Sequence, residues 1–305
     1  MSTPVTELSD ALAAAIAGAG PAVVGVGRSG SGVIVAKDRV VTNAHNVRDK
    51  LEVHFADGTT SEASPAGVDI DGDLAVVNVP TGDNAVLALE AAGAPGKPAL
   101  GEIVVGLSRP RGRTLRAGVG FVTGLGISFQ GPRGRIVTGA VEHSATLARG
   151  SSGGPLIDAS GRLIGFNTHR EGDGLYLALP ATADLLARVD ALGRGEVPRR
   201  PRLGVALAPP RAARHLRQAV GLPPRDGLLV QAVEDDGPAS RAGIRRGDLI
   251  VSVDGRAAKT LEDLAGSLEA AGKSGAAQVA LVRGTEELTV RVEWPDDDPG
   301  APAAA

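Results

Sequence analysis

Residues 150–155, Gly-Ser-Ser-Gly-Gly-Pro, decide how the rest of this sequence is interpreted. A nucleophilic serine needs its hydroxyl exposed on a tight turn, beside backbone N–H groups that converge where an oxyanion forms. The glycines on both sides of Ser152 permit that close approach of the backbone. In a chain with 43 glycines, however, the same stretch also suits an ordinary loop. The turn therefore predicts a nucleophile only if a base and an orienting carboxylate occur elsewhere.

Two segments upstream of this turn supply those partners. An apolar run ends at His45, which places an imidazole at the end of a strand. Asp73 directly precedes another apolar run, although Asp69 and Asp71 compete for the same role. Taken alone, the histidine suits a surface position and the aspartate a turn. Together the three side chains occur in the order His, Asp, Ser, which is one of the known chain orders of the convergent catalytic triad.

Two other motifs match parts of the chain and fit it less well. Residues 150–154 also match the nucleophile elbow of α/β-hydrolases, which needs a helix after the serine and the order Ser, Asp, His. Here strand patterns follow the serine instead. Residues 25–30 match the glycine spacing of a dinucleotide-binding fingerprint, but a strand pattern at 32–36 follows where that site needs a helix.

The composition excludes several classes of function. The 305 residues suggest about two domains, and 43% hydrophobic with 22% charged residues is ordinary for a globular protein. A net charge of −3 argues against a nucleic-acid partner. The chain has no cysteine, and its histidines lack metal-binding spacing. We therefore expect neither a metal nor a cofactor.

The N-terminal region carries no pattern of a membrane segment. No apolar run reaches the roughly 18 residues of a membrane span. The apolar stretch at 11–26 follows Glu7 and Asp10, whereas a secretory leader needs a positive start. Residues 12–17 instead predict a short helix that leads into a strand at 22–27. We expect a cytoplasmic protein, or a periplasmic or otherwise extracytoplasmic one if a leader has been removed.

The pattern of apolar residues changes once along the chain. Period-two runs separated by turn residues recur between residues 22 and 179, which predicts a sandwich or a barrel. Helical spacing at 181–192 closes this unit, and a polar, proline-containing linker follows. Strands then alternate with two helical patterns, at 212–221 and from Thr260, which predicts a small α+β domain. Asp263 forms a capping box with Thr260.

In combination, these motifs resemble the HtrA/Deg (high-temperature-requirement) family of trypsin-like serine proteases with a C-terminal PDZ domain. In the first domain the resemblance rests on TNAHNV at 42–47, DLAVV at 73–77, RGSSGGPLID at 149–158 and GRLIGFNT at 161–168. In the second it rests on RLGV at 202–205, on GPASRAGIRRGDLIVSVDG at 237–255 and on the helical pattern from Thr260.

The resemblance implies a mostly β fold, with a trypsin/chymotrypsin-like double six-stranded β-barrel followed by a small α+β PDZ domain. The expected parts are an N-terminal segment (1–20), a protease domain (21–192), a linker (193–201), a PDZ domain (202–294) and a disordered tail (295–305).

Each site is carried over onto the residues that match the family's motifs. The triad is His45 as base, Asp73 as orienter and Ser152 as nucleophile. The oxyanion hole is formed by the N–H groups of Gly150, Ser151 and Ser152. The substrate pocket is lined by Leu147, Ala148, Asn167, Thr168, Leu177 and Ala178, and the strand at 175–180 pairs with the substrate backbone. The PDZ carboxylate-binding turn is Arg202, Leu203, Gly204 and Val205.

The implied function is a serine endopeptidase of protein quality control and stress response. It would cleave unfolded or misfolded polypeptides after small aliphatic residues through an acyl-enzyme. The PDZ domain would bind peptide C-termini to regulate activity or recruit substrate. Related proteases assemble as homotrimers through the N-terminal segment.

Three segments depart from the family pattern. Ser151 replaces a common Asn, residues 143–145 replace a common Thr-Asp-Ala, and Arg109-Pro110 replaces Asn-Pro. The exchanges at Arg109 and Ser151 motivate the alternative of a non-catalytic peptide-binding or chaperone-like module.

Overall fold

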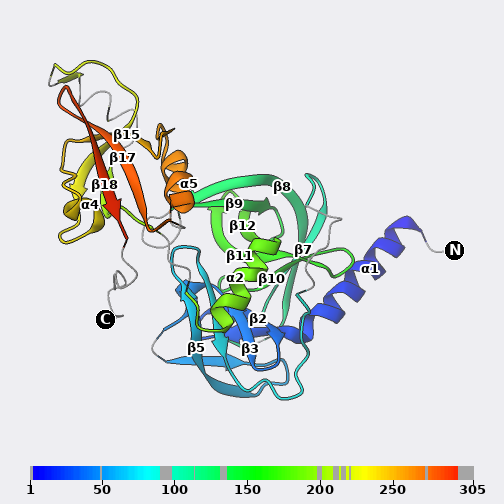
Figure 1. The fold of residues 1–305 in the computed structure, drawn as a ribbon. Coiled ribbons are helices and arrows are strands. Elements are labelled where there is room, and N and C mark those ends of the chain that lie inside the picture. The colour runs from blue at the N-terminus through cyan, green and yellow to red at the C-terminus, as the bar shows by residue number, and fades with distance from the viewer. Residues whose placement is uncertain are drawn as a thin grey trace. The chain divides into compact units, whose positions relative to one another are not determined.

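A computed structural model of the chain describes residues 3–48, 50–89, 98–112, 114–130, 136–197, 201–208, 213, 218–219, 221–271 and 274–294. The chain divides into two compact units, residues 1–198 and 199–305. Figure 1 shows their helices and strands.

The first unit contains two closed six-stranded barrels. In neighbour order, the first barrel consists of β1 (Val23–Val26), β2 (Gly30–Ala36), β3 (Arg39–Thr42), β6 (Leu74–Asn78), β5 (Thr60–Asp69) and β4 (Leu51–His54). The second consists of β10 (Pro155–Asp158), β11 (Leu163–Gly172), β12 (Leu175–Pro180), β9 (Ile136–His143), β8 (Arg116–Gln130) and β7 (Ile103–Ser108). Two short 3-10 helices lie between described strands, η2 (Ala44–Asn46) and η3 (Pro110–Gly112), whereas η1 (Gly20–Ala22) joins the N-terminal helix to β1.

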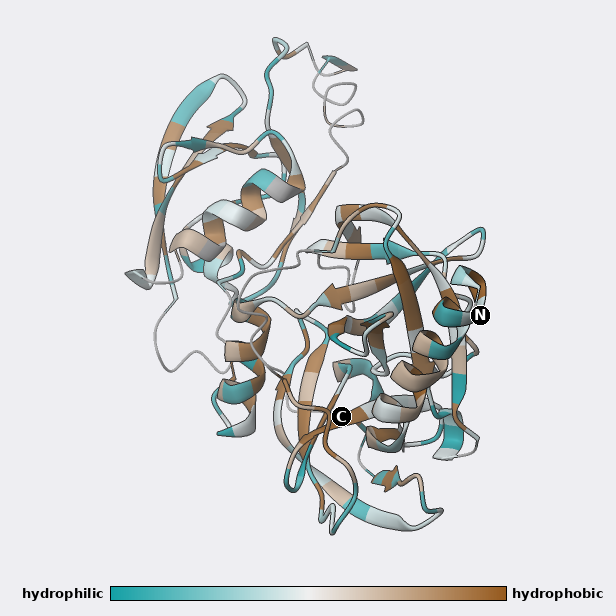
Figure 2. Cartoon of the chain, turned by 90° about the vertical axis from the view of Figure 1, so that its right-hand side faces the viewer, coloured by the Kyte–Doolittle hydropathy of each residue, from teal (hydrophilic) through white to brown (hydrophobic). Residues whose placement is uncertain are grey.

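Aliphatic side chains fill both barrels, as a chain with 2% aromatic residues requires. Figure 2 shows hydrophobic residues running along the strands. Val24, Ile34, Val53 and Val77 are wholly buried in the first barrel. The corresponding fully buried residues of the second barrel include Val104, Leu156 and Ala178. This close packing holds the strand ends, and hence the site residues, in fixed positions.

Two capped helices belong to the first unit. Helix α1 (Pro4–Ala19) begins after Thr3, whose hydroxyl accepts from the Thr6 N–H at 3.3 Å, and Pro4 suits the first helical position. Its buried Ala15 and Ala19 pack in one apolar cluster with Leu107. Helix α2 (Ala183–Gly193) is capped in the same way by Thr182 and packs on β5 and β6.

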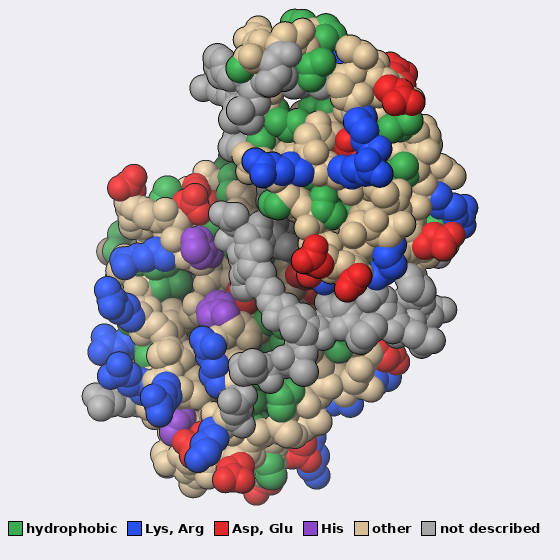
Figure 3. Space-filling model, turned by 90° about the vertical axis from the view of Figure 1, so that its left-hand side faces the viewer, with side chains coloured by type: hydrophobic (Ala, Val, Ile, Leu, Met, Phe, Trp, Pro, Cys, Tyr) green, Lys and Arg blue, Asp and Glu red, His purple; other side chains and the backbone are tan. Residues whose placement is uncertain are grey.

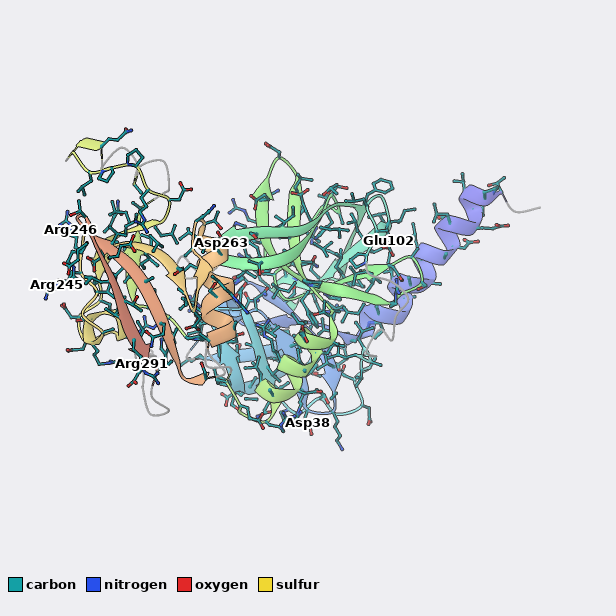
Figure 4. The ribbon with its side chains drawn as sticks, turned by 45° about the horizontal axis from the view of Figure 1, so that its top comes forward. Asp38, Glu102, Arg245, Arg246, Asp263 and Arg291 are labelled. Carbon is teal, nitrogen blue, oxygen red and sulfur yellow. The ribbon has the colours of Figure 1, made fainter. Side chains whose placement is uncertain are left out.

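The second unit is an antiparallel sheet with the helices α4 (Pro238–Arg241) and α5 (Leu261–Ala271) among its described elements. The sheet order is β13 (Val205–Leu207), β14 (Leu228–Val233), β15 (Leu249–Val253), β17 (Ala276–Arg283) and β18 (Glu286–Glu293), and β16 (Arg256–Ala257) pairs with β15. Asp263, labelled in Figure 4, accepts from the Thr260 N–H at 2.9 Å and donates its own N–H to Thr260 Oγ1 at 3.1 Å. This confirms the capping box.

The predicted fold class, a mostly β double barrel followed by a small α+β domain, is confirmed. The N-terminal helix is longer than expected, since it begins at Pro4. Strand β5 escaped prediction because most of its side chains are exposed or half-buried, so its sequence shows no apolar alternation. The predicted helix at 212–221 lies largely outside the described residues, and the tail at 295–305 lies wholly outside them.

Candidate active site

Strand pairing in the first barrel brings His45 and Asp73 together. Strands β3 and β6 are antiparallel neighbours, and their register pairs Thr42 with Ala75. His45 lies just beyond the end of β3, and Asp73 just before the start of β6, so both reach the same edge. His45 Nδ1 lies 2.8 Å from Asp73 Oδ1 and 3.0 Å from Oδ2. Because carboxylate oxygens accept, Nδ1 carries the proton and Nε2 is left as an acceptor.

The Asp73 carboxylate is buried and held from several directions. It accepts from the His45 backbone N–H at 3.3 Å and from the Thr168 hydroxyl at 2.5 Å. Its backbone has a φ of 48°, a left-handed conformation that aspartate tolerates better than most residues. The Asn43 amide donates to the Asp73 carbonyl at 2.8 Å and stabilises this turn. The side chain therefore has one defined orientation toward the imidazole.

The competing aspartate Asp69 has a different role. It is also buried, but its carboxylate accepts from the Gly72 N–H at 2.9 Å and forms an ion pair with Arg188 of α2. This aspartate thus joins helix α2 to the first barrel. Only the tertiary contacts distinguish it from Asp73, because both occur in the same short turn.

The turn that carries Ser152 requires its glycines. Gly150 and Gly153 each have a φ of 89°, which a side chain would strain. A Cβ on Gly150 would lie 2.1 Å from the Ser29 carbonyl oxygen, and one on Gly153 would lie 2.2 Å from the Ser31 carbonyl oxygen. The β1–β2 segment of the first barrel therefore packs directly on this turn of the second.

Hydrogen bonds across the two barrels hold the nucleophile turn. The Ser152 carbonyl accepts from the Ser31 N–H and from the Asn46 side-chain amide, both at 2.9 Å. The Gly153 N–H donates to the Asn167 carbonyl at 2.7 Å. Asn46 directly follows His45 in sequence, so one of these neighbours contacts the nucleophile turn and the other lines the same cavity as Ser152. Sequence reasoning identified neither Ser31 nor Asn46.

The Ser152 hydroxyl and the His45 imidazole border the same cavity, which has a volume of about 1470 Å³. In this structure Ser152 Oγ donates to the Thr168 carbonyl at 2.8 Å. No hydrogen bond joins it to His45 among the described residues. A rotation of the serine side chain is therefore needed before the hydroxyl can donate to Nε2.

The N–H groups predicted for the oxyanion hole have no hydrogen-bond acceptor among the described residues. Neither the Gly150 nor the Ser152 N–H donates a hydrogen bond to a described residue. The Gly150 carbonyl accepts from Ser31 Oγ at 2.8 Å, and Ser31 Oγ accepts in turn from the Arg109 N–H at 3.0 Å. The side chain of Ser151 is buried, and its Oγ lies 2.7 Å from the Ala148 carbonyl oxygen.

Arg109, which replaces the expected asparagine, is buried beneath this turn. Its Nε donates to the Val23 carbonyl at 2.8 Å, and a terminal nitrogen lies 3.4 Å from the Gly20 carbonyl oxygen. Burial lowers the pKa of the guanidinium below its ordinary value. The residue thus links the end of the α1 segment to Ser31 and, through it, to Gly150.

A second cavity of about 310 Å³ adjoins Ser152. Four of the six predicted pocket residues line it: Leu147, Ala148, Asn167 and Thr168. The other two do not, because Leu177 and Ala178 are wholly buried in the barrel core. Tyr176 lines the cavity instead, and its hydroxyl donates to the Leu147 carbonyl at 3.1 Å.

Asn167, which lines this cavity, forms a buried polar pair with His143. His143 Nε2 donates to Asn167 Oδ1 at 3.1 Å, and the Asn167 amide donates to the Gly154 and Pro155 carbonyls. Burial lowers the pKa of His143 to about 4. Its Nδ1 has no hydrogen-bond partner among the described residues. The imidazole is therefore neutral at physiological pH.

The expectation that residues 175–180 pair with the substrate is wrong. This segment is β12, which hydrogen-bonds to β11 on one side and to β9 on the other, so it offers no free edge. The adjoining part of β11 differs. Its pairing with β10 ends at Phe166, and its pairing with β12 is irregular between Asn167 and Arg170. Residues 168–170 also line the cavity beside the nucleophile.

The predicted carboxylate-binding turn lies at the start of the second unit's sheet. Strand β13 is an edge strand that pairs only with β14 among the described strands. The Leu203 carbonyl accepts from the Ala239 N–H, and the Gly204 carbonyl accepts from the Glu234 N–H, both at 2.8 Å. Neither residue's own N–H donates to a described residue. The Arg202 side chain pairs with Glu234 at 2.8 Å.

Among the residues that the structure describes, no group of three or more His, Asp or Glu side chains is placed to hold a metal ion. None of the described helices is both long enough and apolar enough to cross a bilayer.

Comparisons with known proteins agree on both units. Residues 30–166 match the trypsin-like peptidase domain family, and residues 201–294 match the PDZ domain family. The putative serine protease HhoA of Synechocystis sp. is 32% identical over 278 residues, which cover 87% of this chain and 70% of the relative. A probable periplasmic DegP-like serine endoprotease of Brucella suis is 31% identical over 89% of this chain. The chain spans about half of that relative, with 53% covered.

Solved structures give the same result. The serine endoprotease from Yersinia pestis superposes with a TM-score of 0.69 at 26% identity, covering 92% of this chain and 95% of that one. The HtrA-type protease AlgW with a decapeptide has a TM-score of 0.73 at 22% identity, covering 92% and 97%, and supports the fold.

Proposed function

Because this chain belongs to the HtrA/Deg family of trypsin-like serine proteases with a PDZ domain, we propose that it is an active endopeptidase that uses Ser152, His45 and Asp73. The observation that carries the proposal is the contact of His45 Nδ1 with the buried Asp73 carboxylate at 2.8 Å. It leaves Nε2 as the acceptor in the cavity that also holds the serine hydroxyl.

In the first step, substrate binding displaces the Ser152 hydroxyl from the Thr168 carbonyl and turns it toward His45. The imidazole accepts the hydroxyl proton while Oγ attacks the scissile carbonyl carbon. The Asp73 carboxylate holds the ring in the required tautomer and stabilises the positive charge that develops on it. The buried position of this carboxylate supports that role, since water does not screen it.

The unpartnered N–H groups of Gly150 and Ser152 would then stabilise the oxyanion. Collapse of the tetrahedral intermediate transfers the proton from His45 to the leaving amine and forms the acyl-enzyme. A water molecule then donates a proton to Nε2 of His45 and hydrolyses the ester, which restores the serine. The side chain of Ser31 stabilises the oxyanion-hole turn, because its hydroxyl donates to the Gly150 carbonyl at 2.8 Å.

The substrate would be an extended segment of an unfolded or misfolded protein. Its backbone would add to the free edge of β11 at residues 168–170, an interaction that a folded chain cannot make. The residue before the scissile bond would enter the cavity of about 310 Å³ beside Leu147 and Tyr176. The apolar Leu147 and Ala148 in the lining, and the absence of a carboxylate among the described lining residues, support a small aliphatic side chain.

The PDZ unit would bind peptide C-termini and thereby recruit substrate or regulate cleavage. The turn at Leu203 and Gly204 supports this, because its N–H groups are unpartnered among the described residues and can donate to a carboxylate. The edge of β13 would accept the peptide as an added strand. The ion pair between Arg202 and Glu234 reduces the contribution of the arginine to this capture.

We also propose an assembly and a location for this protein. A homotrimer formed through the N-terminal segment is supported by the exposed apolar Val5 and Leu8 on α1, with exposed fractions of 76% and 40%. Figure 1 shows this helix extending outward from the barrels of its unit. An extracytoplasmic location is supported by the DegP-like relatives that are named periplasmic. Light scattering and cell fractionation test the two proposals separately.

Active-site labelling tests the proposed activity. A fluorophosphonate probe is expected to label the full-length protein at Ser152, and the Ser152→Ala variant should stay unlabelled. Turnover of unfolded casein should fall on the order of 10⁶-fold in either Ser152→Ala or His45→Ala, and no further in the double variant. Absence of labelling, with and without C-terminal peptides, would support a non-catalytic peptide-binding module instead.

A further inference from the structure

The cavity that contains His45 and Ser152 is strongly cationic. Six basic residues line it, all of them exposed: Arg28, Arg48, Lys50, Arg111, Arg116 and Arg149. Its described lining residues include no Asp or Glu. The whole chain carries 35 acidic and 32 basic residues, so this concentration is a local property and not a consequence of composition. Figure 3 shows a face on which Lys and Arg side chains gather near histidines.

These basic residues are not engaged in stabilising the fold. None of the six forms an ion pair with a described residue, whereas basic residues elsewhere, such as Arg162 and Arg188, pair with carboxylates. Their positions come from four separate places in the chain: the β1–β2 turn, the segment after η2, the η3–β8 region and the residue before Gly150. Like charges that converge without partners repel one another, and a bound anion relieves that repulsion.

The position of the cavity indicates which part of a substrate meets this charge. His45 lines the large cavity and does not line the smaller one beside Leu147 and Tyr176. The base must protonate the leaving amine, so the chain after the scissile bond passes His45. Arg48 follows His45 closely in sequence, and Arg28, on the turn between β1 and β2, lines the same cavity. Five of the six cations, all except Arg149, line the large cavity and not the smaller one, and these five therefore lie on the leaving-group side.

We propose that this cleft selects substrates with Asp or Glu in the first few positions after the scissile bond. The inference rests on the proposed protease function and adds a substrate class to it. Each exposed ion pair is weak, but several cations in one cleft raise the rate of association with an anionic segment by tenfold or more. The effect weakens as salt is added, because the Debye length is about 10 Å at 0.1 M and about 3 Å at 1 M.

Matched internally quenched peptides test the preference. The peptides share every residue before the scissile bond and carry Asp-Glu, Asn-Gln or Lys-Lys after it. For the full-length wild type at low salt, kcat/KM is expected to be at least about tenfold higher for the acidic than for the neutral peptide, and lowest for the basic one. The differences in kcat/KM among the three peptides should become smaller at high salt. Equal values for the three peptides at low salt would overturn the proposal.

Charge reversal assigns the effect to the cleft. In the double variant Arg48→Glu, Arg111→Glu four of the six cations remain beside two new carboxylates, so the differences in kcat/KM among the three peptides should become much smaller. The matched control is Lys37→Glu, an exposed lysine on the β2–β3 turn that does not line the cavity. It should keep the wild-type order of peptides. An unchanged preference in the cleft variant, with its thermal unfolding intact, contradicts the assignment.

A binding arm separates this inference from the protease function. Fluorescence anisotropy with the Ser152→Ala variant measures the affinity for the same three peptides without any cleavage. If wild type fails to react with fluorophosphonate, the protease function fails, and the order of these affinities alone decides the charge preference. A DNA oligonucleotide that binds the cleft while the acidic peptide does not would overturn the proposal in favour of a nucleic-acid ligand.

Discussion

Thr168 of β11 donates its hydroxyl proton to Asp73 Oδ2 at 2.5 Å, across the junction of the two barrels. The carbonyl of the same threonine accepts from Ser152 Oγ at 2.8 Å. One residue therefore contacts the orienting carboxylate with its side chain and the nucleophile with its backbone. The second barrel supplies the nucleophile, and the first supplies the base and the orienting aspartate. Thr168 therefore helps to hold the catalytic residues of the two barrels in position.

Replacing Thr168 by Val should lower kcat and change KM little. The valine keeps the shape and the backbone carbonyl but removes the donor to the buried carboxylate. A hydrogen bond to a charged group contributes about 1.5–3 kcal/mol, which corresponds to a loss of about 10–100-fold. Steady-state kinetics on a quenched peptide measure the two constants separately. The control Thr168→Ser retains the hydroxyl and should keep most of the activity; equal losses in both variants would contradict the role of the hydroxyl.

Replacing Asp73 by Asn should lower kcat by about 10⁴-fold and leave the fold intact. An amide can donate to Nδ1 and so favours the tautomer that has no free acceptor at Nε2. The matched control is Asp71→Asn on the same turn, which leaves the contact with His45 in place. If the rate of labelling by fluorophosphonate falls by a similar factor in the two variants, Asp73 is not the orienting residue of the triad.

Replacing Arg109 by Met should reduce both stability and turnover. The methionine fills the volume but leaves the Val23 carbonyl without its donor, and an unsatisfied buried acceptor costs about 1–3 kcal/mol. The Arg109 backbone N–H that supports Ser31 would then be held less firmly. Urea unfolding and kcat should therefore change together. If kcat falls only in proportion to the unfolded fraction, Arg109 acts on stability alone and not on the oxyanion turn.

Folding stability should fall in acid because of His143. Its pKa is about 4 in the folded protein and near 6.5 when unfolded, so the unfolded state binds the proton more readily between these values. The contribution is complete above pH 6.5 and is lost progressively as the pH falls toward 4. Below pH 4 the loss is about 3 kcal/mol. Urea unfolding at pH 8, 6 and 4.5 measures it.

The variant His143→Gln gives the control for this acid dependence. Glutamine does not titrate, so the dependence of stability between pH 6.5 and 4 should be reduced relative to wild type. A curve that matches wild type would show that other groups, and not His143, cause the acid dependence.

Replacing Gly204 by Ala should weaken the binding of peptides at the PDZ unit. Gly204 has a φ of 73°, and an added Cβ would lie 2.9 Å from Glu234 Oε2. Leaving the left-handed region would turn its N–H away from the ligand carboxylate. Fluorescence anisotropy with a free and a C-terminally amidated peptide measures the effect. The free peptide should lose affinity in the variant, whereas equal binding of both peptides to wild type would exclude carboxylate capture.

Local patterns in the sequence predicted most strands, because a period of two residues reflects burial of one face of each strand. The polar strand β5 was not predicted, because most of its side chains are not buried and it therefore lacks this period. Motif resemblance located His45, Asp73 and Ser152, but the short turn with Asp69 and Asp71 did not itself distinguish the orienter. The ion pair of Asp69 with Arg188 and the contact of Asp73 with His45 distinguish them.

The sequence by itself therefore determined the family, the order of the strands along the chain and the identity of the three candidate catalytic residues. Only the tertiary structure decided that Leu177 and Ala178 lie in the core, that β11 and not β12 has the free edge, and that six dispersed cations share one cleft. The physical reason is that periodicity and turn chemistry act between neighbours in sequence. Pairing partners and electrostatic fields depend on which distant segments the closed barrels bring together.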